Sequence, residues 1–218
     1  MARVARIVLP GLPHHVTQRG NRSADVFSSD VDRYVYISVL RECSAKRGLE
    51  IWAYCLQSNH VHIVAVPLHE KSLSLALRDA HTAYAAYFNR RQGTGGHVWQ
   101  GRFFSCVMDE AHLWAAVRYV ERNAVRAGLV KRAEEYAWSS APAHCALRED
   151  ALLSGSFPPE GVVADWSAWL ADEDVVSSDR IRKQTHVGRP CGSADFLDRL
   201  ESVLGLKVRP GRRGRKKR

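Results

Sequence analysis

The chain has 218 residues, of which 45% are hydrophobic, and its formal net charge is +9. This length and hydrophobic content suit one domain with extensions and a sizeable buried core. It has no apolar run of 18 residues, and its first residues lack the apolar stretch of a signal peptide. The sequence therefore excludes a transmembrane helix and a signal peptide. Its five cysteines are scattered and never form C-x-x-C, which argues against a disulfide framework and a cysteine zinc site and predicts a protein of the reducing cytoplasm.

The charged residues are unevenly distributed along the chain. Residues 1–148 hold 19 basic and 12 acidic side chains, residues 149–179 hold 8 acidic and no basic ones, and residues 207–218 hold 8 basic and no acidic ones. A basic body and a basic tail favour a nucleic-acid partner, because each phosphate contact releases counterions. The alternative is a solvated tail that only aids solubility.

The first part of the chain predicts a strand, a helix and a hairpin. Residues 14–19 alternate in polarity and predict a strand, which a polar loop follows. Ser29 or Asp30 is expected to cap a helix over 31–47 that ends at Gly48. Residues 49–56 predict a second strand. Only a short turn separates it from a third strand over 60–66, so the two should form an antiparallel hairpin.

The later part of the chain predicts further helices and one more strand. A helix over 71–91 is followed by glycine-rich residues, and then by a strand that leads to Met108. Asp109 is expected to cap a helix over 110–127 that Gly128 closes. Residues 149–180 mix proline, glycine, serine and acids, and predict a linker or a loosely docked segment. Ser193 should cap a helix over 195–204, and the basic tail should be disordered until it meets phosphate.

This order of elements predicts an α+β fold with a ferredoxin-like antiparallel sheet flanked by helices and a C-terminal helical and basic extension. We divide the chain into three parts. They are a main domain over residues 1–145, an acidic linker or docked segment over 146–190, and a short helix with a basic tail over 191–218.

His60 and His62 lie in the third predicted strand. Because side chains alternate between the faces of a strand, the two imidazoles should point the same way. Two imidazoles fixed side by side supply half of a divalent-metal site. The chain has 10 histidines, so chance can also produce one such pair, and the partners elsewhere in the chain must decide.

The helix predicted over 110–127 carries Tyr119 and Asn123 one turn apart, beside its buried stripe. Arg118, Arg122 and Arg126 follow the outer side of the same helix. A phenol, an amide oxygen and three guanidinium groups form an unusual grouping. The alternative is that Tyr119 is an amphipathic packing residue and Asn123 a surface amide.

Together, these two stretches resemble a known family. The sequences Gln-Ser-Asn-His-Val-His-Ile at 57–63 and Arg-Tyr-Val-Glu-Arg-Asn-Ala at 118–124 resemble those of the single-tyrosine HUH transposases, most closely the REP-associated tyrosine transposases of bacteria. Residues 14–21 and 98–103 are also similar, so the resemblance covers about residues 7–140, and the Gly-Arg-Pro at 188–190 is similar too. The family usually has Pro where this chain has Ala124. Since Ala is a good helix former, we expect the pairing of Tyr119 with Asn123 to persist.

The resemblance implies a metal-dependent transposase and single-strand endonuclease, with residues 1–145 as its catalytic domain. Tyr119 would attack a DNA phosphate and form a 5′-phosphotyrosine. His60, His62 and Asn123 would hold Mg²⁺ or Mn²⁺. A phenol with a pKa of about 10 is a weak nucleophile at neutral pH, so a cation that polarises the phosphate suits this chemistry.

The partner implied is a single-stranded DNA hairpin of the REP type, which is cleaved and rejoined at the nucleoid. We expect a monomer, with a homodimer as the alternative. Basic and polar side chains should contact phosphates, and Trp99 should stack on an unpaired base. The expected DNA-binding residues are Arg19, Asn21, Arg22, Trp99, Arg102, Arg122, Arg126, Lys131, Arg212, Arg213, Arg215 and Lys216.

Two other functions stay open from the residues alone. A two-histidine phosphoesterase acting on RNA or cyclic phosphates needs two H-x-T/S motifs. His15-Val-Thr17 supplies one, but the other would be His60-Val-His62, and Tyr119 would have no task. A non-catalytic nucleic-acid-binding regulator on the same sheet would need none of the catalytic residues.

Overall fold

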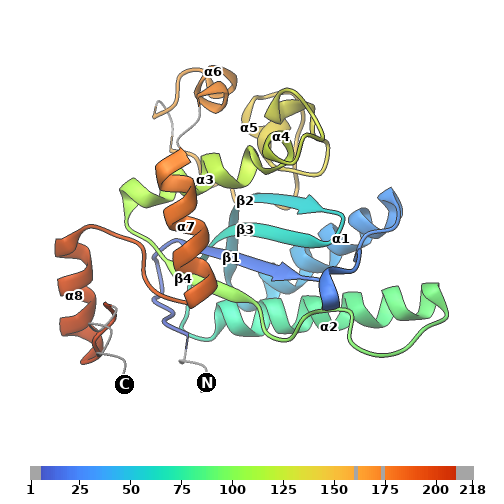
Figure 1. Ribbon diagram of the computed structural model, residues 1–218, viewed down its shortest axis with the longest axis horizontal. Coiled ribbons are helices and arrows are strands. Elements are labelled where there is room, and N and C mark those ends of the chain that lie inside the picture. The colour runs from blue at the N-terminus through green and yellow to red at the C-terminus, as the bar shows by residue number, and fades with distance from the viewer. Residues whose placement is uncertain (1–5, 160–161, 173–174, 210–218) are drawn as a thin grey trace, which may run out of the picture.

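A computed structural model describes residues 6–159, 162–172 and 175–209 of the chain. Its centre is an antiparallel sheet in the order β2-β3-β1-β4. Helices cover both faces, with α1 and α2 on one face and α3 and α7 on the other (Figure 1). This arrangement confirms the predicted α+β class with a ferredoxin-like sheet. The strands are β1 (His14–Arg19), β2 (Leu49–Gln57), β3 (His60–Pro67) and β4 (Phe104–Val107).

The helices include both long covering helices and short connecting turns. The long ones are α1 (Asp30–Arg47), α2 (Ser72–Gln92), α3 (Glu110–Glu121), α7 (Val175–Val187) and α8 (Ala194–Leu204). The short ones are η1 (Asn21–Ser23), α4 (Asn123–Arg126), η2 (Ala133–Glu135), α5 (Ala141–His144) and α6 (Trp166–Ala171). None of the helices in the described part of the chain combines the length and the apolarity that crossing a membrane requires.

The predicted helix caps are confirmed. The Ser29 hydroxyl accepts a hydrogen bond from the backbone N–H of Asp32, whose carboxylate accepts one from the backbone N–H of Ser29, so α1 begins with a capping box. Gly48 ends α1 in the left-handed conformation with a φ of 64°. The Asp109 carboxylate caps α3 by accepting from the backbone N–H of His112 at 3.0 Å.

Strand alternation divides the residues of β3 between two hydrophobic cores. Val61 and Ile63 pack in the core beneath α1 and α2. Val64 packs in the core on the other face, beneath α3. His60 and His62 share the face of Val64, because residues two apart on a strand point the same way. The sheet therefore presents both imidazoles toward α3 and α7.

The helix predicted over 110–127 is interrupted at Arg122. This residue has a φ of −77° and a ψ of 0°, and it separates α3 from α4. The expectation of one continuous helix is therefore wrong at this residue. Backbone hydrogen bonds from Arg122 N to Arg118 O and from Arg126 N to Arg122 O are kept at 2.9 Å. Tyr119 and Asn123 consequently stay one turn apart across the break.

The segment over residues 146–190, predicted as an acidic linker or docked segment, contains α6 and all of α7. Trp166, Leu170 and Ile181 are buried in the core beneath α3, so the described part of this stretch is docked. Further on, the predicted cap of α8 is confirmed, since the Ser193 hydroxyl accepts from Phe196 N at 3.2 Å. The basic tail, residues 210–218, lies outside the described residues.

Candidate active site

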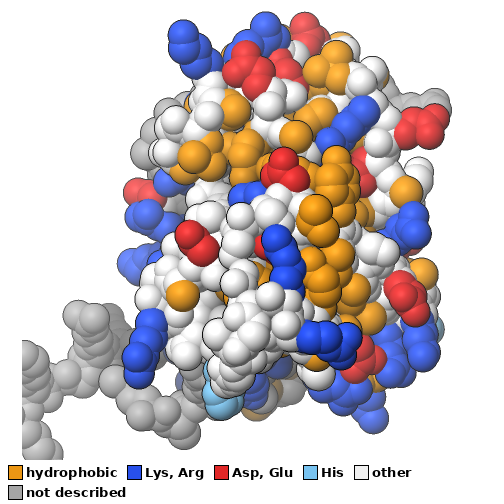
Figure 2. Space-filling view, turned by 90° about the vertical axis from the view of Figure 1, so that its right-hand side faces the viewer, with side chains coloured by type: hydrophobic (Ala, Val, Ile, Leu, Met, Phe, Trp, Pro, Cys, Tyr) orange, Lys and Arg blue, Asp and Glu red, His pale blue; other side chains and the backbone are white. Residues whose placement is uncertain are grey.

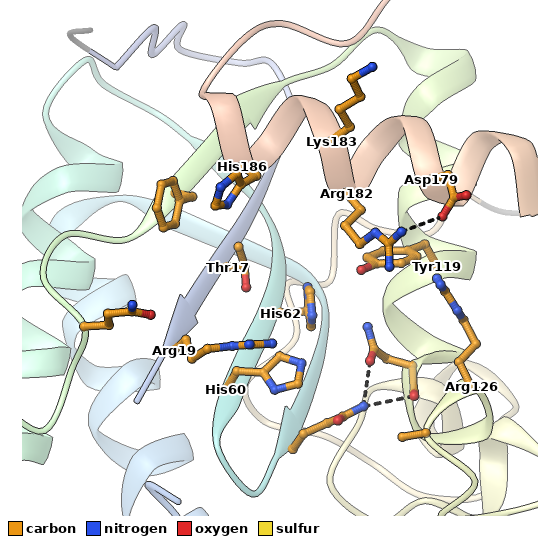
Figure 3. Close-up of a pocket in the computed structure, with 15 residues that line it drawn as sticks. Thr17, Arg19, His60, His62, Tyr119, Arg126, Asp179, Arg182, Lys183 and His186 are labelled. Atoms are coloured by element: carbon orange, nitrogen blue, oxygen red, sulfur yellow. Dashed lines mark hydrogen bonds and ion pairs between the residues drawn. The ribbon is translucent and has the colours of Figure 1, made fainter. Parts of the chain in front are cut away.

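One cavity brings the predicted catalytic residues together. It has a volume of about 850 Å³ and lies between the α3 side of the sheet and α7 (Figure 3). His60 and His62 project into it from β3, and Tyr119 faces them from α3. The residues that line it are Thr17, Arg19, Gln57, His60, His62, Gln100, Phe104, Tyr119, Asn123, Arg126, Ala127, Asp179, Arg182, Lys183 and His186.

The strand register fixes the position of the two histidines. His60 lies opposite Arg19 of β1 and Gln57 of β2, and His62 lies opposite Thr17 of β1. The imidazole centroids are 5.0 Å apart, with an angle of 78° between the ring planes. Because β3 is hydrogen-bonded on both sides, the sheet holds both side chains on a rigid support.

The hydrogen bonds of His60 determine which of its ring nitrogens carries a lone pair. The Asn59 Nδ2 donates to the backbone carbonyl of Ser23 at 3.2 Å, so the amide oxygen of Asn59 faces His60. This oxygen lies 2.6 Å from His60 Nδ1 and accepts its proton. The Nε2 atom of neutral His60 then keeps a lone pair, and a neutral imidazole binds a metal through such a nitrogen.

Burial keeps both imidazoles neutral. It lowers the pKa of His60 to about 4, and the nearby Arg19 guanidinium acts in the same direction. Burial also lowers the pKa of His62 well below its usual value of 6.5, aided by His15 and His60. Neutral imidazoles are ligands rather than cations at neutral pH, so the protonation state of the pair suits a metal site.

Tyr119 is buried against the histidines. Only 4% of the residue is exposed, and its ring lies edge-on to His62 with the centroids 5.4 Å apart. The guanidinium carbon of Arg126 lies 4.9 Å from the ring centroid. Burial raises the pKa of Tyr119, while Arg126, Arg182 and hydrogen bonding by Asn123 oppose this rise. The site thus surrounds a desolvated phenol with groups that favour its phenolate.

Asn123 is held by a residue of the neighbouring strand. The Gln57 amide nitrogen donates to the side-chain oxygen of Asn123 at 2.6 Å and to its backbone oxygen at 2.9 Å. The side-chain oxygen is therefore fixed beside the cavity and has a second lone pair to offer. Two imidazole nitrogens and an amide oxygen form a donor set that fits a divalent cation, and suits Mn²⁺ better than Mg²⁺.

No group of three or more His, Cys, Asp or Glu that could hold a metal ion occurs among the described residues. The donor set described above contains two histidines and an asparagine, so it is not a site made of three His, Cys, Asp or Glu side chains. An amide ligand also leaves the charge of a bound cation uncompensated by the protein, which favours an anionic ligand such as phosphate.

Sequence reasoning missed several residues of the site. Gln57 could have been found, because it lies directly across the predicted hairpin from His60 and shares its face. Arg182, Lys183 and His186 could not, because they lie on α7, which was not predicted as a helix. His15 was assigned a role only in the phosphoesterase alternative, although it lies in the similar stretch 14–21, and its Nε2 lies 3.0 Å from His62 Nδ1.

Some of the predicted DNA-binding residues lie at this cavity. Arg19 and Arg126 line it. Asn21 and Arg22 are exposed on η1, which contacts the turn between β2 and β3 through the hydrogen bond from Asn59 to Ser23. These four side chains are therefore near the site or lie beside the hairpin that carries it.

Other predicted DNA-binding residues lie elsewhere. Trp99 is buried in the core beneath α1 and α2, and its indole N–H donates to the His81 carbonyl at 3.1 Å. This position does not support the expected stacking on a base. Arg102 is exposed beside a second cavity of about 590 Å³. Arg122 donates to the carbonyls of α6, and Lys131 is exposed. Arg212, Arg213, Arg215 and Lys216 lie outside the described residues.

The charge around the cavity is predominantly positive. Its lining includes Arg19, Arg126, Arg182 and Lys183, against a single carboxylate, Asp179. Asp179 lies 3.2 Å from Arg182 in an exposed ion pair. By contrast, the face in Figure 2 carries basic and acidic side chains interspersed around a central hydrophobic strip. Such a lining suits an anionic ligand, because several cations act on the same space.

Three comparisons with known proteins bear on this site. The family described as "Transposase IS200 like" matches residues 10–123, just over half of the chain. A structure described as a REP-associated tyrosine transposase bound to a REP hairpin is similar, with a TM-score of 0.56 and 18% identity, over 74% of this chain and 96% of that one. At this identity the likeness shows the fold alone.

A crystal structure of a protein from Deinococcus radiodurans R1, named as a transposase candidate, is also similar. It shares 18% identity over 56% of this chain and 97% of that one, with a TM-score of 0.38. No curated protein matches the chain.

Proposed function

The chain belongs to the family of IS200-like transposases, and on this premise we propose that it cleaves and rejoins single-stranded DNA hairpins through a covalent bond to Tyr119. The observation that carries the proposal is the packing of the Tyr119 ring edge-on to His62, 5.4 Å between centroids, in a cavity that His60 and Asn123 also line. A nucleophile and three ligand-type side chains thus converge from β3, α3 and α4.

The proposed reaction is a transesterification at phosphorus. The Tyr119 oxygen attacks a DNA phosphate, a bond forms between that oxygen and phosphorus, and the bond from phosphorus to the 3′ oxygen breaks. The phenol loses its proton as this bond forms and the departing 3′ oxygen takes up a proton, so the products are a 5′-phosphotyrosine and a free 3′-hydroxyl. A later 3′-hydroxyl reverses these steps and rejoins DNA without ATP, since the covalent bond conserves the energy of the phosphodiester.

The residues of the cavity have distinct roles in this reaction. Arg126 and Arg182 favour the phenolate of Tyr119 and attract the phosphate. His60, His62 and Asn123 would hold Mn²⁺ or Mg²⁺, which supplies Lewis-acid polarisation of the phosphate when bound. Gln57 keeps the Asn123 oxygen directed at the cavity.

The proposed DNA partner is a single-stranded hairpin. The REP hairpin in the similar solved structure and the cationic lining of the cavity support this choice. We propose that Arg19, Asn21 and Arg22 contact backbone phosphates near the site, and that the basic tail adds affinity. We propose that the protein acts as a monomer. We also propose that it acts at the nucleoid in the cytoplasm, because all five cysteines are free, as in a reducing compartment.

The test is a denaturing-gel assay with end-labelled hairpin oligonucleotides taken from repeats that flank the gene. The wild-type protein should give a shifted covalent band with Mn²⁺ and none with EDTA. Tyr119→Phe should abolish the band, because it removes only the attacking oxygen. Tyr34→Phe is a matched control, since Tyr34 is 66% exposed and does not line the cavity, and it should leave the band unchanged.

Two other outcomes would replace the proposal. Cleavage without a covalent band that survives Tyr119→Phe would favour the two-histidine phosphoesterase. Hairpin binding with neither cleavage nor a covalent band, on several hairpins, would favour the non-catalytic regulator.

A further inference from the structure

A buried chain of hydrogen bonds runs from α7 to His62. His15 Nε2 lies 3.0 Å from His62 Nδ1, and His15 Nδ1 lies 2.7 Å from the Thr185 hydroxyl. That hydroxyl also lies 3.2 Å from the Cys106 sulfur. His15, Thr185 and Cys106 are at most 1% exposed, so water does not compete for these bonds. The chain therefore connects the sheet, α7 and the proposed metal ligand.

Two directions of donation are possible along this chain. In the first, His62 Nδ1–H donates to His15 Nε2, and His15 Nδ1–H donates to the Thr185 oxygen. The Nε2 atom of His62 then has a lone pair facing the cavity. In the second direction every bond is reversed, and His62 Nε2 carries a proton. Only the first direction leaves His62 able to bind a cation.

The Thr185 hydroxyl is what makes the first direction available. The Thr185 oxygen lies 2.7 Å from His15 Nδ1 and can accept the proton of that nitrogen. Without the hydroxyl, the first direction would bury an N–H group with no acceptor, which is rare in proteins. The second direction would then be favoured, because His62 Nε2–H could donate to solvent in the cavity.

We propose that Thr185, acting through His15, is a positioning residue that keeps the proton of His62 on Nδ1 and its lone pair on Nε2. The inference rests on the proposed function, since it concerns the same metal ligand. It assigns to α7 a part in metal binding, although Thr185 lies well outside residues 10–123 that match the family. Figure 3 shows α7 crossing the site next to His62 and Tyr119.

His60 provides an internal comparison. Its Nδ1 is bonded to the amide oxygen of Asn59, which can only accept. The tautomer of His60 is therefore set by Asn59, whose amide is itself oriented by the Ser23 carbonyl. The tautomer of His62 depends instead on a partner that can donate or accept, and hence on the contact between β1 and α7.

The test compares two pairs of variants in the full chain. Thr185→Val removes the hydroxyl and keeps the shape, whereas Thr185→Ser keeps the hydroxyl. His15→Leu removes both bonds, whereas the amide of His15→Gln can accept from His62 and donate to Thr185. Isothermal titration with Mn²⁺ alone should show affinity weakened by roughly 10–100-fold in Thr185→Val and His15→Leu. The Thr185→Ser and His15→Gln variants should stay close to wild type.

A spectroscopic measurement separates positioning from general damage to the fold. In metal-free protein labelled with ¹⁵N-histidine, NMR should report a protonated Nδ1 and an unprotonated Nε2 for His62 in wild type. Thr185→Val should move the proton toward Nε2 while the thermal unfolding midpoint reports an intact fold. If His15→Leu does not fold, the comparison of Thr185→Val with Thr185→Ser decides.

The proposal is overturned if wild-type His62 carries its proton on Nε2, or if Thr185→Val leaves both the tautomer and the Mn²⁺ affinity unchanged. Neither measurement uses DNA or the hydroxyl of Tyr119. A protein that shows the expected tautomers but never forms a covalent DNA band would therefore refute the proposed function and leave this inference standing.

Discussion

Replacing Gln57 with leucine should weaken metal binding without touching a proposed ligand. The Gln57 amide nitrogen makes two hydrogen bonds to Asn123, at 2.6 Å to the side-chain oxygen and 2.9 Å to the backbone oxygen. Gln57→Leu removes both and frees the Asn123 side chain to turn. The bond to the side-chain oxygen is worth about 1–2 kcal/mol because Asn123 is buried, so Mn²⁺ binding should weaken roughly tenfold.

The assay is formation of the covalent DNA band over a series of Mn²⁺ concentrations. Gln57→Leu should need roughly ten times more Mn²⁺ for half of the maximal rate, and saturating Mn²⁺ should restore most of that rate. Gln92→Leu is a matched control, because Gln92 donates only to the Ser28 hydroxyl at an exposed position. An identical Mn²⁺ dependence in the two variants would refute the reasoning, provided that both unfold at the wild-type temperature.

Three further changes test the charge and the stability of the fold. Arg126→Gln should slow formation of the covalent band roughly 100-fold at saturating Mn²⁺, whereas Arg90→Gln at the exposed end of α2 should not. Burial lowers the pKa of His14 to about 4 and of His81 to about 3. Below pH 6.5 the unfolded chain therefore binds more protons, and denaturant titrations should show stability falling by several kcal/mol between pH 6.5 and 4; a flat profile would contradict this. Ser29→Ala should lower the unfolding free energy by about 1 kcal/mol through loss of the capping box of α1, and an unchanged urea midpoint would show that the cap is dispensable.

The sequence by itself determined the elements whose signals are local. Residues 14–19 form the predicted strand, and Ser29, Asp109 and Ser193 cap their helices as predicted. The common face of His60 and His62 also followed from the sequence, because alternation on a strand needs no knowledge of the partner strands. These features depend on residues within a few positions of each other, which is why a pattern along the chain reveals them.

Contacts between distant residues were decided only by the tertiary structure. Trp99 is of a residue type that often stacks on bases, but its ring packs against those of His81 and Tyr36 in the hydrophobic core. Residues 149–179 carry eight acids and no base, which is typical of a solvated linker, yet Trp166 of α6 and Ile181 of α7 are buried in the core beneath α3. Neither outcome is encoded in a local period, because both depend on which surface the rest of the fold leaves open.

The site shows the same division. The sequence supplied the histidine pair on β3 and the tyrosine helix, each from its own spacing. The hydrogen bonds that orient their side chains join residues that are 66 positions apart between Gln57 and Asn123 and 170 apart between His15 and Thr185. No spacing rule reaches so far along the chain. Those bonds exist because the antiparallel register and the docking of α7 bring the partners together, and this packing decides which nitrogen of His62 faces the cavity.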